Sequence, residues 1–120
     1  HTAIYVGRGT PSLRAKTGRH DLSSHKHYVI EYGNAERMTV SSGVAVGKVV
    51  SGKGCQTIVI SEMDISRPWY VFEIDSFQYG PHNSRERTVE RAASKLGSDF
   101  GGYDIFWNNC QHFAVWARYG

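Results

Sequence analysis

The C-terminal stretch "FWNNCQHFAVWARYG" (residues 106–120) has the composition of a helix that begins just before a cysteine. Asparagine is a preferred N-cap residue, so Asn108 or Asn109 can start the helix and place Cys110 in its first turn. The first N–H groups of a helix have no partner within it, and together with the positive end of the helix dipole they favour a thiolate nearby. Because thiolate is the nucleophilic form of cysteine, the position suits a nucleophile. It also suits a small buried cysteine, and position alone does not choose between the two.

Two C-terminal helices are predicted from apolar residues that recur with the spacing of one helix face. These residues are Val89, Ala92, Ala93 and Leu96 before the cysteine, and Phe113, Trp116 and Ala117 after it. Pro81 together with Asn83 or Ser84 favours the start of the first helix, and Gly97 favours its end.

The rest of the chain predicts strands. Runs of β-branched and aromatic residues, separated by turns that contain glycine, lie at 2–9, 27–34, 37–54, 55–65 and 68–77. Strands followed by helices indicate an α+β fold, in which an antiparallel sheet of about five to six strands packs against the two C-terminal helices. A chain of 120 residues is short enough to form a single domain, 1–120.

Residues 10–26 are rich in Ser, Thr, Gly and charge, and they predict a long basic loop. With a net charge of +3, the chain favours anionic partners such as a phospholipid surface or RNA. No apolar run reaches the roughly 18 residues of a transmembrane segment, and no C-x-x-C, H-E-x-x-H or Gly-rich phosphate motif occurs. We therefore expect no cofactor and no metal. Two cysteines, Cys55 and Cys110, favour reduced thiols in a cytoplasmic protein.

A cysteine nucleophile needs a histidine base that is near it in space. His112 lies two residues after Cys110, so on a helix it points to a different side. Two other histidines open strand-like segments of the form H-x-x-I-x-x-G, "HTAIYVG" from His1 and "HYVIEYG" from His27. Each of these positions also fits a surface residue at a strand end.

The last helix resembles a known motif. "NNCQHFAVWARYG" (108–120) is similar to the NC box of the lecithin:retinol acyltransferase-like proteins, which include small phospholipase A/acyltransferases and picornaviral 2A proteins of the H-box/NC type. The box reads Asn-Cys-Glu-His-Phe and is usually followed by Arg-Tyr-Gly, and Gln111 stands here in place of the glutamate. The matching residues are Asn109, Cys110, His112, Phe113, Arg118, Tyr119 and Gly120. The resemblance implies an NlpC-like, papain-like fold with Cys110 as its nucleophile.

The family's other box begins with the catalytic histidine, and both H-x-x-I-x-x-G segments resemble it. We prefer His27 as the base, because a strand precedes it and its spacing to Cys110 is nearer to that of the smaller family members. His1 is the alternative. A second histidine of the family orients the first, and this chain has none at that place. Thr39 would take its position if His27 is the base, and Glu31 if His1 is.

The resemblance implies a thiol-dependent phospholipid acyl hydrolase or acyltransferase that works through an acyl-Cys110 thioester, with His27 as base and then acid. The alternative is a non-catalytic viral relative of the 2A type that binds a host protein, a membrane or RNA. A cysteine peptidase or amidase of the wider fold is a third hypothesis, although no peptide-specificity pocket is encoded. We expect a cytoplasmic protein, peripheral at membranes, or in the host cytoplasm if viral.

Overall fold

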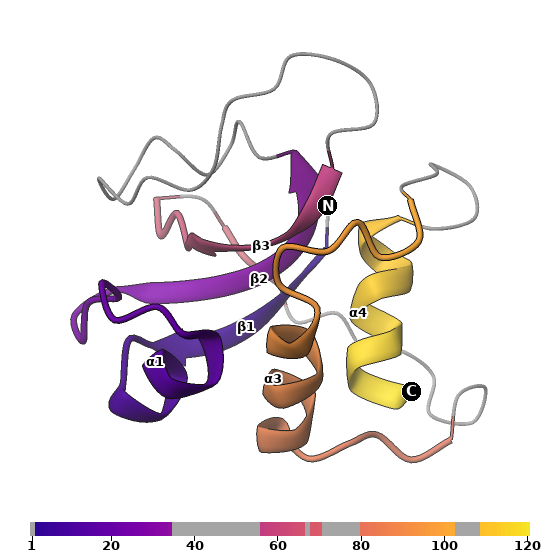
Figure 1. Cartoon of the computed structure of the whole chain (residues 1–120), viewed down its shortest axis with the longest axis horizontal. Helices are drawn as coiled ribbons and strands as arrows, with labels where there is room; N and C mark the ends of the chain where they lie inside the picture. The colour runs from indigo at the N-terminus through magenta and orange to yellow at the C-terminus, as the bar shows by residue number, and fades with distance from the viewer. Residues whose placement is uncertain (1, 35–55, 67, 71–79, 103–108) are drawn as a thin grey trace.

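The computed structural model describes residues 2–34, 56–66, 68–70, 80–102 and 109–120. In this part of the chain the strands precede two C-terminal helices, as the sequence predicts, and one further helix follows the first strand (Figure 1). The elements in chain order are β1 (Ala3–Arg8), α1 (Pro11–Thr17), β2 (His27–Asn34), β3 (Gln56–Glu62), α3 (Arg85–Ser94) and α4 (Cys110–Tyr119). The α+β fold class is confirmed.

The three strands form an antiparallel sheet in the order β1-β2-β3. Ala3 pairs with Glu31, and Arg8 pairs with His27, so β1 begins beside the end of β2. β3 runs back along the other edge of β2 and ends beside its start, where Glu62 pairs with Tyr28. Each end of the sheet therefore brings together residues that are far apart in the sequence.

Three of the expected strands are confirmed as β1, β2 and β3. The strand or strands expected within 37–54 lie outside the described residues, as does most of the strand expected at 68–77. Residues 68–70 are described, and they are exposed and not in a strand. The described part of the chain thus contains three strands, against the five to six expected for the whole.

The hydrophobic core lies between one face of the sheet and the helices. Alternate residues of β2 and β3 point toward the helices because side chains on a strand alternate between its two faces. The buried side chains that meet there are Leu13, Leu22, Tyr28, Ile30, Tyr32, Ile58, Ile60, Ala92, Phe113 and Ala117. α4 contacts both β1 and β2, and α1 and α3 contact β1, so the three helices cover this face together (Figure 1).

The expectation of a long loop over residues 10–26 is wrong for its first half, which forms α1. Thr10 caps this helix, since its Oγ1 accepts a hydrogen bond from the Leu13 N–H at 3.2 Å. Pro11 occupies the first turn, and Gly18 ends the helix with a φ of +70°, which suits glycine. A helix of seven residues with Leu13 as its one buried side chain shows no periodicity, so composition alone indicated a loop.

The start and end of α3 follow the sequence signals. Ser84 is the N-cap residue, and its Oγ accepts a hydrogen bond from the Arg87 N–H at 3.1 Å. After the helix the chain turns through Gly97, whose φ is +82°. The Gly97 N–H then donates to the Ile58 carbonyl at 2.8 Å, and the Ile58 N–H donates to the Ser98 carbonyl at 2.9 Å. The chain after α3 is thereby bound to β3.

Candidate active site

Cys110 is the first residue of α4, and the structure places it as the sequence predicts. Asn109 is the N-cap residue, and its Oδ1 accepts hydrogen bonds from the N–H groups of Gln111 at 3.0 Å and His112 at 3.2 Å. Cys110 is a free thiol, half-buried, and it packs against the hydrophobic core. The nucleophile candidate therefore lies at a capped helix start and keeps partial access to solvent.

The cap of α4 provides no acceptor for the N–H group of Cys110. The Asn109 N–H donates to His112 Nδ1 at 3.2 Å, and the Phe113 N–H donates to the Asn109 carbonyl at 3.0 Å. Since Gln111 and His112 donate to the Asn109 side chain, the neighbouring N–H groups of this turn all have acceptors. The Cys110 N–H has none within the described part of the chain. A donor is thus free beside the sulfur, where an oxyanion would form in acyl transfer.

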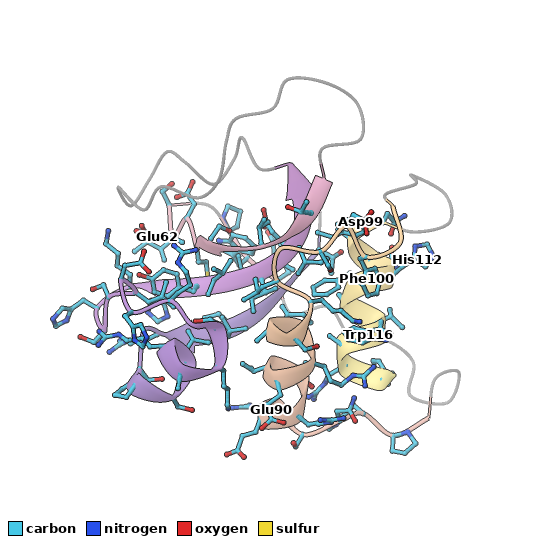
Figure 2. All side chains as sticks on the ribbon, viewed as in Figure 1. Glu62, Glu90, Asp99, Phe100, His112 and Trp116 are labelled. Atoms are coloured by element: carbon cyan, nitrogen blue, oxygen red, sulfur yellow. The ribbon has the colours of Figure 1, made fainter. Side chains whose placement is uncertain are left out.

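The first turns of α4 lie over the end of the sheet where β2 ends and β1 begins (Figure 1). Phe113, one turn after Cys110, is fully buried, and its ring centroid lies 6.5 Å from that of Tyr32 in β2. Phe100 packs edge-on against both rings and against Trp116, next to α4 (Figure 2). This aromatic cluster holds the start of α4 against the sheet.

Glu31 is a buried carboxylate at the same end of the sheet. Its exposed fraction is 6%, and it pairs with Ala3, the first residue of β1. A Cβ atom built on Gly33 would lie 3.4 Å from Glu31 Oε1, so the carboxylate lies along the strand toward Gly33. His1 and Thr39 lie outside the described residues.

His27 lies at the opposite end of β2. Its Nδ1 is 2.7 Å from the Tyr5 hydroxyl oxygen, and the two rings stack with centroids 5.9 Å apart. Five residues of strand separate His27 from Tyr32, which corresponds to about 17 Å. Because α4 packs its first turns near Tyr32, the structure does not bring His27 together with Cys110.

The other described histidines have different settings. His112 Nδ1 accepts a hydrogen bond from the Asn109 N–H in the cap of α4. This agrees with the expectation that His112 is a poor partner for Cys110. His82 Nδ1 is 3.0 Å from the Asn83 carbonyl, and its ring packs against Tyr119, at the far end of α4. His20 and His25 are exposed in the segment between α1 and β2.

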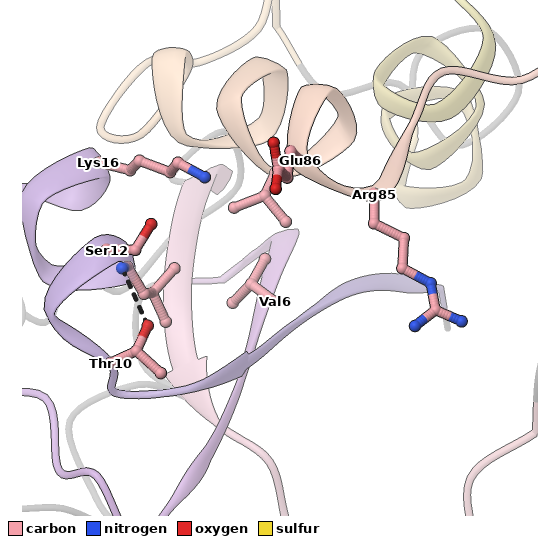
Figure 3. A pocket seen from close by; sticks show the side chains of 8 residues that line it. Val6, Thr10, Ser12, Lys16, Arg85 and Glu86 are labelled. Atoms are coloured by element: carbon pink, nitrogen blue, oxygen red, sulfur yellow. Dashed lines mark hydrogen bonds between the residues drawn. The ribbon is translucent and has the colours of Figure 1, made fainter.

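A separate cavity of about 140 Å³ lies between β1, α1 and α3 (Figure 3). Its apolar lining comes from Val6, Leu13 and Val89, and its polar lining from Thr10, Ser12, Lys16, Arg85 and Glu86. The Lys16 ammonium points toward Glu86 across the opening (Figure 3). No lining residue comes from β2 or α4, so the cavity is distinct from the site at Cys110.

The described residues contain no group of three His, Cys, Asp or Glu side chains placed to hold a metal ion. A search of the same residues for a helix with the length and apolar character to cross a membrane finds none.

The fold and the site define a class: an α+β protein with Cys110 at the N-terminus of a helix that packs on an antiparallel sheet. Comparison with known sequences gives the family. The sequence model of the lecithin retinol acyltransferase family matches residues 1–120, so the chain belongs to this family. The chain is 23% identical over 90 residues to the lecithin retinol acyltransferase of Homo sapiens. The match covers 75% of this chain and 38% of the human protein.

Proposed function

We propose that this protein transfers or hydrolyses acyl groups of lipid esters, with Cys110 as the nucleophile. Membership of the lecithin retinol acyltransferase family supports an acyltransferase that acts on lipids. The observation that carries the proposal is the setting of Cys110, a half-buried free thiol in the first turn of α4 whose own N–H group has no acceptor among the described residues. Phospholipids are the substrate class we expect, within the NlpC-like arrangement that the sequence resemblance implies.

The reaction has two steps. A histidine removes the thiol proton of Cys110, and the sulfur attacks the ester carbonyl carbon to give a tetrahedral oxyanion. The Cys110 N–H donates a hydrogen bond to that oxyanion. The carbon–oxygen bond then breaks, the departing alcohol takes the proton from the imidazolium, and an acyl-Cys110 thioester remains. A hydroxyl, an amine or water attacks the thioester in the second step and releases the thiol.

We propose His1 as the base, in place of the His27 that the sequence favours. The side chain of His27 is engaged with Tyr5 at the other end of β2. His1 precedes Ala3 by two residues in the sequence, and Ala3 pairs with Glu31 at the end of the sheet over which α4 begins. Glu31 is buried there, and a carboxylate that accepts from an imidazole N–H fixes the orientation and tautomer of the ring. Glu31 thus takes the part of the family's second histidine.

Acylation by a soluble p-nitrophenyl acyl ester, followed by intact-protein mass spectrometry, tests the proposal. We expect one acyl adduct on the wild-type protein, at Cys110, and none on Cys110→Ser. His1→Ala should slow the formation of the adduct at least tenfold, whereas the matched variant His27→Ala should leave the rate unchanged. The opposite result for the two histidines would restore His27 as the base. A folded wild-type protein that forms no adduct and releases no p-nitrophenol would contradict catalysis and favour the non-catalytic relative.

Glu31→Gln separates an orienting role from a purely structural one. Glutamine keeps the volume and can still accept a hydrogen bond, but it lacks the charge that stabilises an imidazolium. We expect slower acylation with little change in thermal stability. The cytoplasmic location, peripheral at membranes, stays a prediction.

A further inference from the structure

The backbone of Phe100 has a conformation that is unusual for its residue type. Its φ is +49°, and it is the one non-glycine residue with a positive φ in the part of the chain that the structure describes. Gly101 and Gly102, which follow it, have φ values of +83° and +94°. Glycine adopts such values readily, whereas the Cβ atom of phenylalanine disfavours them. A residue of this kind persists where its surroundings hold it, and such residues gather at active sites and ligand clamps.

Hydrogen bonds to Asp99 fix the backbone on both sides of Phe100. The Asp99 carbonyl accepts from the Tyr32 hydroxyl of β2 and from the Gly102 N–H, the latter at 2.9 Å. The Asp99 carboxylate accepts from the Gly101 N–H at 3.2 Å. The turn that carries Phe100 is therefore attached to the end of the sheet over which α4 begins.

The ring of Phe100 packs on the row of α4 side chains that begins at Cys110. Cys110, Phe113 and Trp116 are spaced three residues apart, so they lie in one row along the helix, which we call the α4 row. The ring centroid of Phe100 lies 5.3 Å from the centroids of both Phe113 and Trp116 (Figure 2). Phe100 and Cys110 also pack against the same hydrophobic core. The ring is thus held beside the row that leads away from the sulfur.

Part of this apolar surface is open to solvent. Phe113 is fully buried, whereas Cys110, Phe100 and Trp116 are half-buried. A ligand attached to the sulfur can therefore contact Phe100 and Trp116 but not Phe113. Apolar surface that is left accessible beside a nucleophile suits the apolar part of a substrate.

The other sides of α4 next to Cys110 are polar. Asn109 forms the cap, and the side chains of Gln111 and His112 are exposed. An acyl chain makes no hydrogen bonds, so it gains from apolar contact and not from these groups. Among the described residues of this turn, the apolar surface next to the sulfur therefore lies along the α4 row toward Trp116.

We propose that Phe100 contacts the acyl chain of the substrate and gives the site a preference for long chains. The inference rests on the proposed function, because it assigns a substrate-binding residue to the same site. In the acyl-Cys110 thioester the chain stays on the sulfur after the alcohol has left, so it is the part of the substrate held closest to α4. A short acyl group ends before it reaches the ring, whereas a long chain lies along the α4 row and covers the exposed part of Phe100. The strained backbone holds the ring at that place.

The rates of reaction with p-nitrophenyl octanoate and p-nitrophenyl acetate, followed by the release of p-nitrophenol, test the contact. Their ratio reports the length of the acyl chain, because the leaving group is the same. We expect Phe100→Ala to lower the ratio of the octanoate rate to the acetate rate at least about fivefold, since only the long chain loses an apolar contact. Phe100→Tyr keeps the ring and should keep the wild-type ratio. An unchanged ratio in Phe100→Ala would overturn the proposal, and so would a higher one, which would mean that the ring obstructs the chain.

Two further variants separate the contact from general effects on folding. Phe100→Gly removes the ring but suits the positive φ, so it should fold and lower the ratio as Phe100→Ala does. Val89→Ala also removes half-buried apolar contact from the same core, but Val89 lines the separate cavity between β1, α1 and α3. This variant should leave the ratio unchanged. Equal falls in Val89→Ala and Phe100→Ala would overturn the proposal, because they would trace the effect to a loosened core.

The failure of this proposal can be told apart from the failure of the proposed function. A wild-type protein that reacts with both esters, and whose ratio is the same in Phe100→Gly, would refute the chain contact alone. A wild-type protein that forms no adduct and releases no p-nitrophenol with either ester would refute the acyl transfer, and the chain contact with it.

Discussion

Asn109 and His112 cap each other at the start of α4. Asn109 Oδ1 accepts from the His112 N–H, and His112 Nδ1 accepts from the Asn109 N–H, both at 3.2 Å. This is the reciprocal arrangement of a capping box, with histidine in the place usually taken by Glu or Gln. Cys110 lies between the two partners in the sequence, so the pair fixes the backbone that carries the sulfur.

Replacement of His112 tests the cap. His112→Ala removes the acceptor of the Asn109 N–H and should lower the free energy of unfolding by about 1 kcal/mol. His112→Gln can restore the acceptor, since glutamine is a standard residue at this position of a capping box, and should recover most of the loss. Urea denaturation measures both variants. An equal loss in the two would mean that the packing of the imidazole, and not its hydrogen bond, is what stabilises the helix.

Asn109→Asp separates the stability of the helix from the reactivity of its cysteine. Aspartate is a good N-cap residue and its charge suits a helix N-terminus, so the free energy of unfolding should change by less than about 0.5 kcal/mol. The same carboxylate stands next to Cys110 and disfavours a second negative charge on the sulfur. Acylation of Cys110 should therefore slow severalfold while folding is preserved. A rate equal to that of the wild type would show that the reaction does not depend on the thiolate.

The helix starts were predictable because capping is local chemistry. The side chains of Asn109 and Ser84 accept hydrogen bonds from N–H groups no more than three residues further along the chain, so the residue type alone predicts the helix start. The structure confirms both residues as N-caps. α1 carried similar signals in Thr10 and Gly18, but its single buried side chain gave no periodicity to support them. Short helices held by caps are thus easily taken for loops.

The sequence could not show which histidine lies nearer to Cys110. The two H-x-x-I-x-x-G segments are alike, and the choice between His1 and His27 depends on which end of β2 lies under α4. That end is set by contacts between distant residues, such as Tyr32 with Phe113. His112 also has a structural role, because it completes the capping box with Asn109. The spacing Asn-x-x-His fits such a box, although Glu or Gln is the usual residue at the position of His112.

Asp21 should make a small contribution to stability that depends on pH. The Arg19 guanidinium donates to both carboxylate oxygens of Asp21 at 3.0 Å, and this bonding lowers the pKa of Asp21 below its ordinary value of 3.8. A group whose pKa is lower in the folded state stabilises the fold above its unfolded pKa, and the contribution is lost as the pH falls through the folded value. The pair is partly exposed to solvent, which screens it, so the contribution is at most about 1 kcal/mol.

An NMR titration of the Asp21 carboxyl carbon measures this pKa directly. Arg19→Gln should raise it toward 3.8, because the charge and most of the hydrogen bonding are removed. His20 also lowers the pKa through its charge, but it is the smallest cause, so His20→Ala should shift the titration less than Arg19→Gln does. A larger shift for the histidine variant would contradict the assignment to Arg19.

Arg118 should contribute more to stability than an exposed arginine, because it joins the end of α4 to the start of α3. Its Nη1 donates to the Asn83 carbonyl at 2.7 Å, while the Asn83 N–H donates back to the Arg118 carbonyl at 2.7 Å. The Asn83 side chain also donates to the Ala117 carbonyl, at 3.2 Å. Arg118→Met keeps the aliphatic stem but removes a charge-assisted bond, and should cost about 1.5 kcal/mol in urea denaturation. Arg118→Lys keeps the charge without the guanidinium fork, so its free energy of unfolding should lie between those of the methionine variant and the wild type.

Arg87→Met is the matched control for the Arg118 variants. Arg87 lies on α3, 3.7 Å from Glu90, with more than half of its side chain exposed. Exposed pairs of this spacing on a helix contribute little, so this variant should change the free energy of unfolding by less than about 0.5 kcal/mol. The comparison isolates the contact between the helices from the general effect of removing one positive charge. Similar losses for Arg87→Met and Arg118→Met would show that charge alone, and not the link between α3 and α4, accounts for the effect.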